Sequence, residues 1–205
     1  MTPEENAAKV IESLPATLPA EHRYVVAIAG PPASGKSTLA AALVDAFDGR
    51  AGLMAMDGFH FDDAILIERG DRARKGAPHT FDVVSYAMTL RSLRESPGIE
   101  QSVPTFDRTL ELSRNCASLV RAEHQIVVTE GNYLLLNSSP WTTLAPLFDF
   151  TVWLDVPMTT IEERNSARWA EFDYSPQQIS DWLETNDLPN ARLTQSSSVK
   201  GDLVI

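Results

Sequence analysis

Cysteine, basic residues and long apolar runs are scarce in this sequence. The chain has 1 cysteine, Cys116, which cannot form a disulfide within the chain, and this fits a reducing compartment. It has 17 Lys and Arg against 28 Asp and Glu, so it lacks the positive surface that binding to a nucleic-acid backbone requires. No apolar run approaches the roughly 20 residues of a membrane-spanning helix, and acids stand near the start where a signal peptide carries positive charge. We therefore expect a cytoplasmic protein with neither a nucleic-acid nor a membrane partner.

The length and the composition indicate one folded domain over residues 1–205. Of the 205 residues, 43% are hydrophobic and 22% are charged, as in ordinary folded domains. Short apolar strands alternate with helical segments, which predicts an α/β fold with a mostly parallel sheet. The predicted strands are Tyr24–Ala29, Gly52–Met56, Gln125–Thr129, Phe150–Leu154 and Leu203–Ile205. The first predicted helix begins at Pro3 and ends before Pro15. The other predicted helices are part of 62–75, Lys36–Phe47, Asp82–Arg94, Pro157–Phe172 and Pro176–Leu183. A small hairpin is predicted at Thr109–Leu112.

The strongest motif lies between the first predicted strand and the helix after it. The residues GPPASGKS match the pattern G-x-x-x-x-G-K-[ST] in full, in the strand–loop–helix context that the pattern requires. Glycines let such a loop turn its N–H groups toward an anion, and the helix start adds a positive dipole end. Lys36 is expected to reach the β- and γ-phosphates of a nucleoside triphosphate, and the Ser37 hydroxyl to bind Mg²⁺. The predicted phosphate-binding residues are Gly30, Ala33, Ser34, Gly35, Lys36, Ser37 and Thr38.

Two acidic residues that follow predicted strands are candidates for the chemistry. Asp57 comes directly after the strand Gly52–Met56 and Glu130 directly after Gln125–Thr129, each with a glycine next to it. Ligands of open α/β sheets bind at the carboxyl ends of the strands. Glu130 stands where an acid that serves Mg²⁺ belongs, and Asp57 is the candidate base for an acceptor hydroxyl. Each acid can alternatively cap the turn that follows it.

Taken in order, the motifs resemble those of the phosphoribulokinase/uridine kinase group of P-loop kinases. The segments that carry the resemblance are the glycine-rich loop, MDGFH, ERGDRARKGAPHTFD, VPTFDR, VVTEGNYLLL, DVP and NDLPNARL. They look most like the branch that holds type I pantothenate kinase and small bacterial fructose transport system kinases or fructokinases, and they run from about Val25 to the C-terminus. The resemblance implies a P-loop NTPase fold, a three-layer sandwich with a small helical lid at about 157–172.

The resemblance also implies ATP-dependent phosphorylation of a hydroxyl group on a small metabolite, with Mg²⁺. By that similarity Asp57 is the catalytic base, and Glu130 binds the metal ion and lies next to the bound acceptor. Phe106 matches an aromatic position of the family's acceptor segment, and Arg108 stands where pantothenate kinases carry a histidine, so both are predicted to bind the acceptor. The relatives further suggest a dimer or a tetramer, and a homodimer is the expected state.

The segment Pro157–Phe172 carries the arginines expected in the lid. Arg164 and Arg168 are one helical turn apart and therefore share a helix face. Arginines brought in by a closing segment stabilise the charge on a transferred phosphoryl group, so both are predicted catalytic residues. The alternative is a solvated face, with Arg168 paired to Glu171.

Other candidates have two readings each. His60 and Asp82 are predicted to contact the acceptor, although His60 can be structural and Asp82 can cap the next helix. The basic run Arg69–Lys75 either receives a polar or anionic acceptor or is solvated. Asn186 lies in a segment that resembles a loop beside the nucleotide base, and its amide can read adenine or simply form a turn.

A small-molecule kinase is therefore the expected function. A sugar such as fructose is the first choice of acceptor, on resemblance, followed by a nucleoside or a pantothenate-like alcohol. The alternatives are a P-loop ATPase that transfers phosphate only to water and a nucleotide-binding regulator without catalysis. A kinase predicts ATP turnover that rises sharply when the correct acceptor is supplied.

Overall fold

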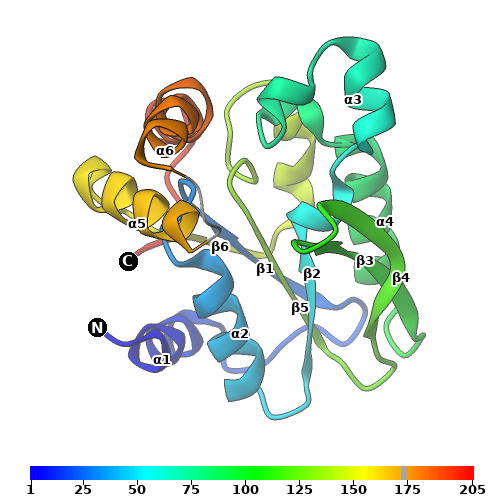
Figure 1. Cartoon of the computed structure of the whole chain (residues 1–205). Coiled ribbons are helices and arrows are strands. Elements are labelled where there is room, and N and C mark those ends of the chain that lie inside the picture. The colour runs from blue at the N-terminus through cyan, green and yellow to red at the C-terminus, as the bar shows by residue number, and fades with distance from the viewer. Residues whose placement is uncertain (172–174) are drawn as a thin grey trace.

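A five-stranded parallel sheet forms the centre of the molecule (Figure 1). The computed structural model describes residues 1–171 and 175–205. In the order β2-β5-β1-β6-β7, the strands are Ala51–Ala55, Ile126–Gly131, Tyr24–Ala29, Phe150–Trp153 and Leu203–Val204. Every residue of β1 and β5 is buried, as their central positions require. The predicted α/β class with a mostly parallel sheet is confirmed.

Helices cover both faces of the sheet and complete three layers (Figure 1). One face carries α1 (Pro3–Ser13) and α2 (Lys36–Ala46), and the other carries α4 (Val83–Glu95) and the 3-10 helix η4 (Trp141–Leu147). Alternate residues of β1 enter different cores: Val26 packs with α1 and α2, and Val25 packs with α4. The alternation follows from the two-residue period of a strand.

The N-terminal helix begins as the sequence predicts. Thr2 Oγ1 accepts the N–H of Glu5 at 3.2 Å, and the Glu5 carboxylate accepts the N–H of Thr2 at 2.7 Å. These reciprocal bonds satisfy two N–H groups that a helix start leaves free. Leu14 caps the other end of α1, directly before Pro15.

Arg23, just before β1, joins distant segments of the chain. Its side chain is fully buried. The guanidinium donates to the carbonyl oxygens of Leu93, Ser96, Ile99, Arg121 and His124 at 2.7–3.2 Å. It therefore ties the end of α4 to the turn that precedes β5.

A second, antiparallel sheet shares no strand with the main one and packs beside β2. It consists of β3 (Gln101–Asp107) and β4 (Leu112–Val120). We predict a hairpin only at Thr109–Leu112, and this is too short, because that stretch is mostly the turn between two longer strands. The hairpin packs closely on the 3-10 helix η1 (Met56–Phe59), where a Cβ added to Gly58 would lie 2.5 Å from the carbonyl oxygen of Pro104. Along the chain, α3 (Asp63–Arg69), η2 (Arg72–Arg74) and η3 (Pro78–Thr80) lie between η1 and α4.

The helical segments that follow β6 form one wall of a cleft. They are α5 (Met158–Ala170), α6 (Pro176–Trp182), the π-helix η5 (Leu183–Asp187) and α7 (Leu188–Ser197). The loop predicted around Asn186 is wrong, because the chain stays helical there and Pro189 lies in the first turn of α7, where proline is tolerated. Phe172, the predicted end of the lid, lies outside the described residues. In the described ranges, no helix is long and apolar enough to cross a membrane.

Candidate active site

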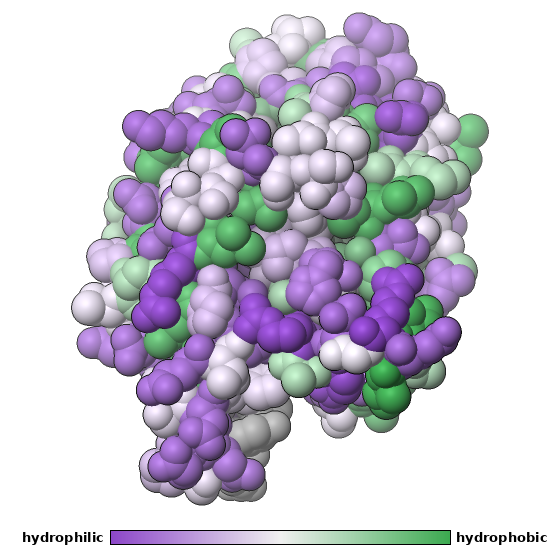
Figure 2. All heavy atoms as spheres, turned by 90° about the horizontal axis from the view of Figure 1, so that it is seen from above, coloured by the Kyte–Doolittle hydropathy of each residue, from purple (hydrophilic) through white to green (hydrophobic). Residues whose placement is uncertain are grey.

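A cleft of about 960 Å³ opens at the carboxyl ends of the main-sheet strands (Figure 2). The loop after β1, the turn after β2, the end of β5 and the C-terminal helices form its walls. Figure 2 looks onto this end of the molecule, where hydrophilic side chains gather around the hollow. The predicted residues that line the cleft are Ala33, Ser34, Gly35, Lys36, Ser37, Thr38, Asp57, His60, Phe106, Arg108, Glu130, Arg164, Arg168 and Asn186. Gly30 begins the loop behind them.

The loop after β1 has the backbone shape of an anion cradle. Ala33 and Gly35 have positive φ values of 59° and 98°, so successive peptide groups change direction sharply. The buried ammonium of Lys36 donates to the carbonyl oxygen of Pro31 at 2.8 Å and to Ser34 Oγ at 3.4 Å. Burial lowers the pKa of Lys36 to about 8, although the charges of the nearby carboxylates Glu130 and Asp57 act to raise it. A phosphate chain in the loop would supply that ammonium with anionic partners.

Ser37 and Glu130 form a pair whose oxygens fit a metal ion. Ser37 Oγ donates to Glu130 Oε1 at 2.9 Å, and the glutamate is 7% exposed near the end of β5. Burial raises the pKa of Glu130, and the charge of Asp57 adds to the shift. Hydroxyl and carboxylate oxygens suit Mg²⁺, which keeps several waters and uses few protein ligands. The structure, as far as it is described, groups no three His, Cys, Asp or Glu for a metal, so phosphate oxygens and water would complete the shell.

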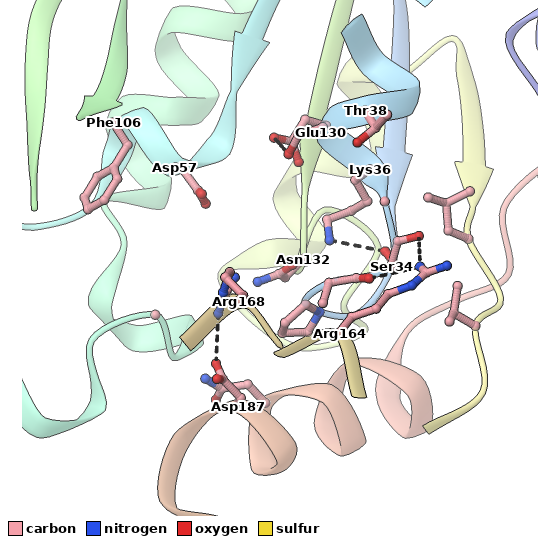
Figure 3. A pocket seen from close by; sticks show the side chains of 18 of the residues that line it. Ser34, Lys36, Thr38, Asp57, Phe106, Glu130, Asn132, Arg164, Arg168 and Asp187 are labelled. Carbon is pink, nitrogen blue, oxygen red and sulfur yellow. Dashed lines mark hydrogen bonds and ion pairs between the residues drawn. The ribbon is translucent and has the colours of Figure 1, made fainter. Parts of the chain in front are cut away.

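Asp57 lies on η1, directly after β2, and its carboxylate points into the cleft (Figure 3). Because β5 separates β2 from β1, Glu130 stands between Asp57 and the phosphate loop. Arg108 Nη2, from the hairpin turn, donates to Asp57 Oδ2 at 3.0 Å. The side chain of Asp57 is 26% exposed, so an incoming molecule can reach it. The structure thus brings the predicted base together with a predicted acceptor-binding residue.

Aromatic rings line the same side of the cleft. The ring centroid of His60 lies 4.0 Å from that of Phe81 and 4.7 Å from that of Phe106. His60 Nδ1 is 2.8 Å from the carbonyl oxygen of Asp57, and a carbonyl can only accept, so Nδ1 carries the proton. Burial lowers the pKa of His60 and favours the neutral ring. His60 therefore supports the backbone of Asp57 and keeps Nε2 as an acceptor.

The two predicted lid arginines lie on α5 but have different contacts. Arg164 Nη1 donates to the carbonyl oxygens of Ala33 at 3.2 Å and Ser34 at 3.4 Å, so it supports the phosphate loop. Arg168 extends into the cleft, where its Nη2 lies 3.6 Å from Asp187 Oδ1 (Figure 3). Its ion pair is thus with a residue of η5, in place of the Glu171 pair that the sequence offers as an alternative.

The basic run Arg69–Lys75 forms paired structure on the acceptor side. Lys75 Nζ is buried and donates to Asp63 Oδ1 at 2.7 Å and to the carbonyl oxygen of Glu111 at 2.5 Å. Arg72 Nε donates to Asp63 Oδ2 at 2.7 Å. Arg72 and Lys75 also line the cleft. This run therefore builds the wall beside Asp57 and holds the hairpin turn against it.

Two predicted ligand contacts have structural partners. Asp82 caps α4, where its Oδ1 accepts the N–H of Ser85 at 2.9 Å, and it does not line the cleft. We therefore correct its assignment from acceptor binding to helix capping. Asn186 lines the cleft, but it is 2% exposed and its Nδ2 donates to the carbonyl oxygen of Lys75 at 2.9 Å. Its amide is thus occupied by the protein, contrary to the predicted reading of adenine.

Asp187 also lines the cleft, although no motif in the sequence points to it. The amide of Asn186 is able to read a base, whereas the carboxylate next to it suggests no such role. The usable signal is charge: a carboxylate needs a cation if the fold buries it. The arginines of the predicted lid are the cations that a folded chain could bring to it.

A nucleotide switch needs only the phosphate cradle and its metal, because water is its acceptor. This cleft has in addition a separate wall, built from η1, the hairpin and the run 69–75, with a carboxylate facing the cradle. Fold and cleft together define an ATP-dependent P-loop kinase that phosphorylates a small metabolite. The chain belongs to the phosphoribulokinase/uridine kinase group of P-loop kinases.

Comparison with known proteins gives this family assignment. No family model matches the chain. A "putative fructose transport system kinase" from Silicibacter sp. TM1040, a solved structure, is 35% identical, with a TM-score of 0.89 over 100% of this chain and 99% of that one. "Putative uridine kinase C227.14" of Schizosaccharomyces pombe is 29% identical over 196 residues, 90% of this chain and 83% of that one. The pantothenate kinase of Corynebacterium diphtheriae is 30% identical over 146 residues, 68% of this chain, which spans 46% of that enzyme.

Proposed function

We propose that the protein transfers the γ-phosphoryl group of ATP, with Mg²⁺, to a hydroxyl group of a sugar such as fructose. The observation that carries the proposal is Asp57, an accessible carboxylate that faces the phosphate loop across the cleft (Figure 3). A carboxylate in that place can take the proton of an alcohol as its oxygen attacks phosphorus.

Each part of the cleft has a role in this reaction. Lys36 and the loop N–H groups bind the β- and γ-phosphates, and Ser37 with Glu130 would hold Mg²⁺, which neutralises phosphate charge when bound. Asp57 accepts the proton of the acceptor hydroxyl, whose oxygen forms the new bond to phosphorus while the bond to ADP breaks. Arg168 stabilises the charge on the group in transfer.

A sugar suits the lining of the acceptor side. Arg72 and Arg108 each have N–H groups besides the one that a carboxylate takes, and these can donate to hydroxyl groups, while the ring of Phe106 offers an apolar face. The relative from Silicibacter that is 35% identical over nearly its whole length also favours a sugar. A nucleoside or a pantothenate-like alcohol is the second candidate, on the two matched kinases with those names.

The proposal is tested by ADP release in the presence of single acceptors. A panel of ketoses, aldoses, nucleosides and pantothenate is supplied with ATP and Mg²⁺, and the product is identified by mass spectrometry. Fructose or a related sugar should raise ADP release well above the rate in water. Turnover that no acceptor stimulates would support an ATPase, and stimulation by uridine or pantothenate alone would replace the sugar by that substrate.

A further inference from the structure

Asp187 is a buried carboxylate on the wall of the cleft to which the reaction above gives no role. It ends η5 and is 7% exposed. Its Oδ2 accepts a hydrogen bond from Trp169 Nε1 at 2.6 Å, and its Oδ1 lies 3.6 Å from Arg168 Nη2. Both oxygens therefore contact α5 (Figure 3). A carboxylate engaged in this way orients the side chains it contacts and has little left to offer a ligand.

Arg168 needs such a partner because other cations share its cleft. Its side chain is 35% exposed and lies in the cleft with Lys36 and Arg108. Burial, and then the charge of Arg108, lower the pKa of Arg168, whereas Asp187 favours its charged form. The guanidinium carbon also lies 4.9 Å from the ring centroid of Trp169. A planar guanidinium held at one edge directs its remaining N–H groups along fixed lines.

The turn that carries Asp187 is itself fixed to the acceptor side of the cleft. Asn186 Nδ2 donates to the carbonyl oxygen of Lys75 at 2.9 Å, and Asn186 Oδ1 accepts from Asn190 Nδ2 at 3.1 Å. Arg74 Nη2 donates to Asn190 Oδ1 at 3.2 Å. π-Helical turns are rare and occur frequently at functional sites. This π-helical turn contacts both the wall beside the acceptor and the lid helix α5. The acceptor wall and the side chain of Arg168 are therefore held by the same turn.

We propose that Asp187 is a positioning residue, which holds the guanidinium of Arg168 toward the phosphoryl group during transfer. The inference rests on the proposed function, because it assumes phosphoryl transfer in this cleft. Without the charge of Asp187, Arg168 remains in the cleft but can turn away. The loss should therefore appear when the transferring group is bound, and not when ADP is bound alone.

The test compares the binding of ADP with that of ADP–aluminium fluoride in the presence of Mg²⁺. The fluoride complex imitates the group in transfer and needs no acceptor. Asp187→Asn keeps an oxygen for Trp169 and should weaken binding of the fluoride complex by about 10- to 100-fold, because a small misplacement of a group that acts on the reacting atoms can cost about 100-fold. Binding of ADP should not change. Asp181→Asn, on the exposed side of α6, is the matched control and should bind both as the wild type does.

A double-mutant cycle separates positioning from a general structural effect. Arg168→Ala should weaken binding of the fluoride complex at least as much as Asp187→Asn does, and the double variant should be no weaker than Arg168→Ala alone. Losses that multiply in the double variant, or an Asp187→Asn protein that binds like the wild type, would overturn the positioning role. A wild type that binds the fluoride complex no better than ADP would instead overturn the proposed function.

A second variant keeps the test valid if Asp187→Asn unfolds. Arg168→Lys retains the charge at a partly exposed position but lacks the planar fork that Asp187 orients. It should lose binding of the fluoride complex and keep that of ADP, with an unchanged midpoint of thermal unfolding. Binding of the fluoride complex at the wild-type level by Arg168→Lys would overturn the inference.

Discussion

The carboxylate of Asp57 is the single group on which the proposed chemistry depends most directly. Asp57→Asn keeps its size but cannot take a proton, so kcat with the best acceptor should fall by about 10²–10⁴-fold. The Kd of ATP, measured by titration calorimetry, should stay near the wild-type value. Asp45→Asn makes the same change on the exposed face of α2 and should leave kcat unaltered. Full activity in Asp57→Asn would mean that another group is the base.

Lys36 should make ATP binding depend on pH. Burial lowers its pKa to about 8, so part of the free protein has a neutral Lys36 near that pH. Bound phosphates favour the charged amine and raise its pKa, so binding should take up a proton above about pH 8 and hardly any near pH 6.5. ATP affinity should accordingly decrease as the pH rises through this window. Calorimetry in buffers of different ionisation enthalpy measures the uptake.

The control for this pH effect is Lys36→Met, which has no amine to titrate. Whatever ATP it still binds should be bound without the additional proton above pH 8. The same uptake in Lys36→Met, or equal uptake at the two pH values, would assign the proton to a different group.

Residues whose role is local were predictable from the sequence. The Thr2–Glu5 capping box and the phosphate loop depend on neighbours a few positions away, so their spacing shows them. Asp82 and Asn186 are harder to assign, because each has both a structural and a ligand-binding interpretation. A short polar side chain can meet either the nearby backbone or a ligand, and only the folded contacts decide between the two.

At the scale of elements, the contact between the hairpin and η1 can be tested at Gly58. A Cβ there would meet the carbonyl oxygen of Pro104 at 2.5 Å, so Gly58→Ala should push the hairpin away from Asp57. We expect the KM of the acceptor to rise by about tenfold or more, because small displacements of positioning groups are costly. The Kd of ATP should be little changed. Initial-rate kinetics with varied acceptor measure the effect.

Met88→Ala, at an exposed position of α4 outside the hairpin, is the control for Gly58→Ala. It should have the kinetics of the wild type. An equal rise in the KM of ATP and of the acceptor in Gly58→Ala would show that the change disturbs the whole cleft and not the hairpin alone.

Elements that are buried on both faces have a clear pattern in the sequence, and exposed elements do not. The continuous apolar run of β1 is a clear strand signal. The strands β3 and β4 are only partly buried and contain polar residues, a proline and a register shift, so their composition suggests a loop. For α7, Asn and Pro at its start suggest a turn, although both are compatible with the first turn of a helix.

At the scale of the whole molecule, Arg23 should be a main support of the fold. Arg23→Met would remove the donor from five carbonyl oxygens, and each one that stays buried and unsatisfied costs about 1–3 kcal/mol. We expect the free energy of unfolding to fall by roughly 3–5 kcal/mol, because more than one of these oxygens loses its partner. Urea denaturation followed by circular dichroism measures this. Arg91→Met, on the exposed face of α4, should change it by less than about 1 kcal/mol.

The overall architecture was predictable because it follows from a few strong rules. Alternation of strands and helices predicts a parallel sheet, and the phosphate loop fixes which end of it binds ligand. The identity of the acceptor is not encoded in this way. It depends on η1, the hairpin and the loop 69–75, which come together from separate parts of the chain and whose spacing in sequence says little about their distance in space.

The order of strands has one more consequence. The phosphate loop follows β1, Glu130 lies on β5 and Asp57 follows β2, so three reaction partners are attached to three consecutive strands. Strands in a sheet lie about 4.8 Å apart, so the attachment points of cradle and base are roughly 10 Å from each other. That distance is fixed by the hydrogen-bonded backbone of the sheet and does not depend on the surrounding loops. Variation in the hairpin could therefore exchange one alcohol for another while the separation of donor and base stays the same.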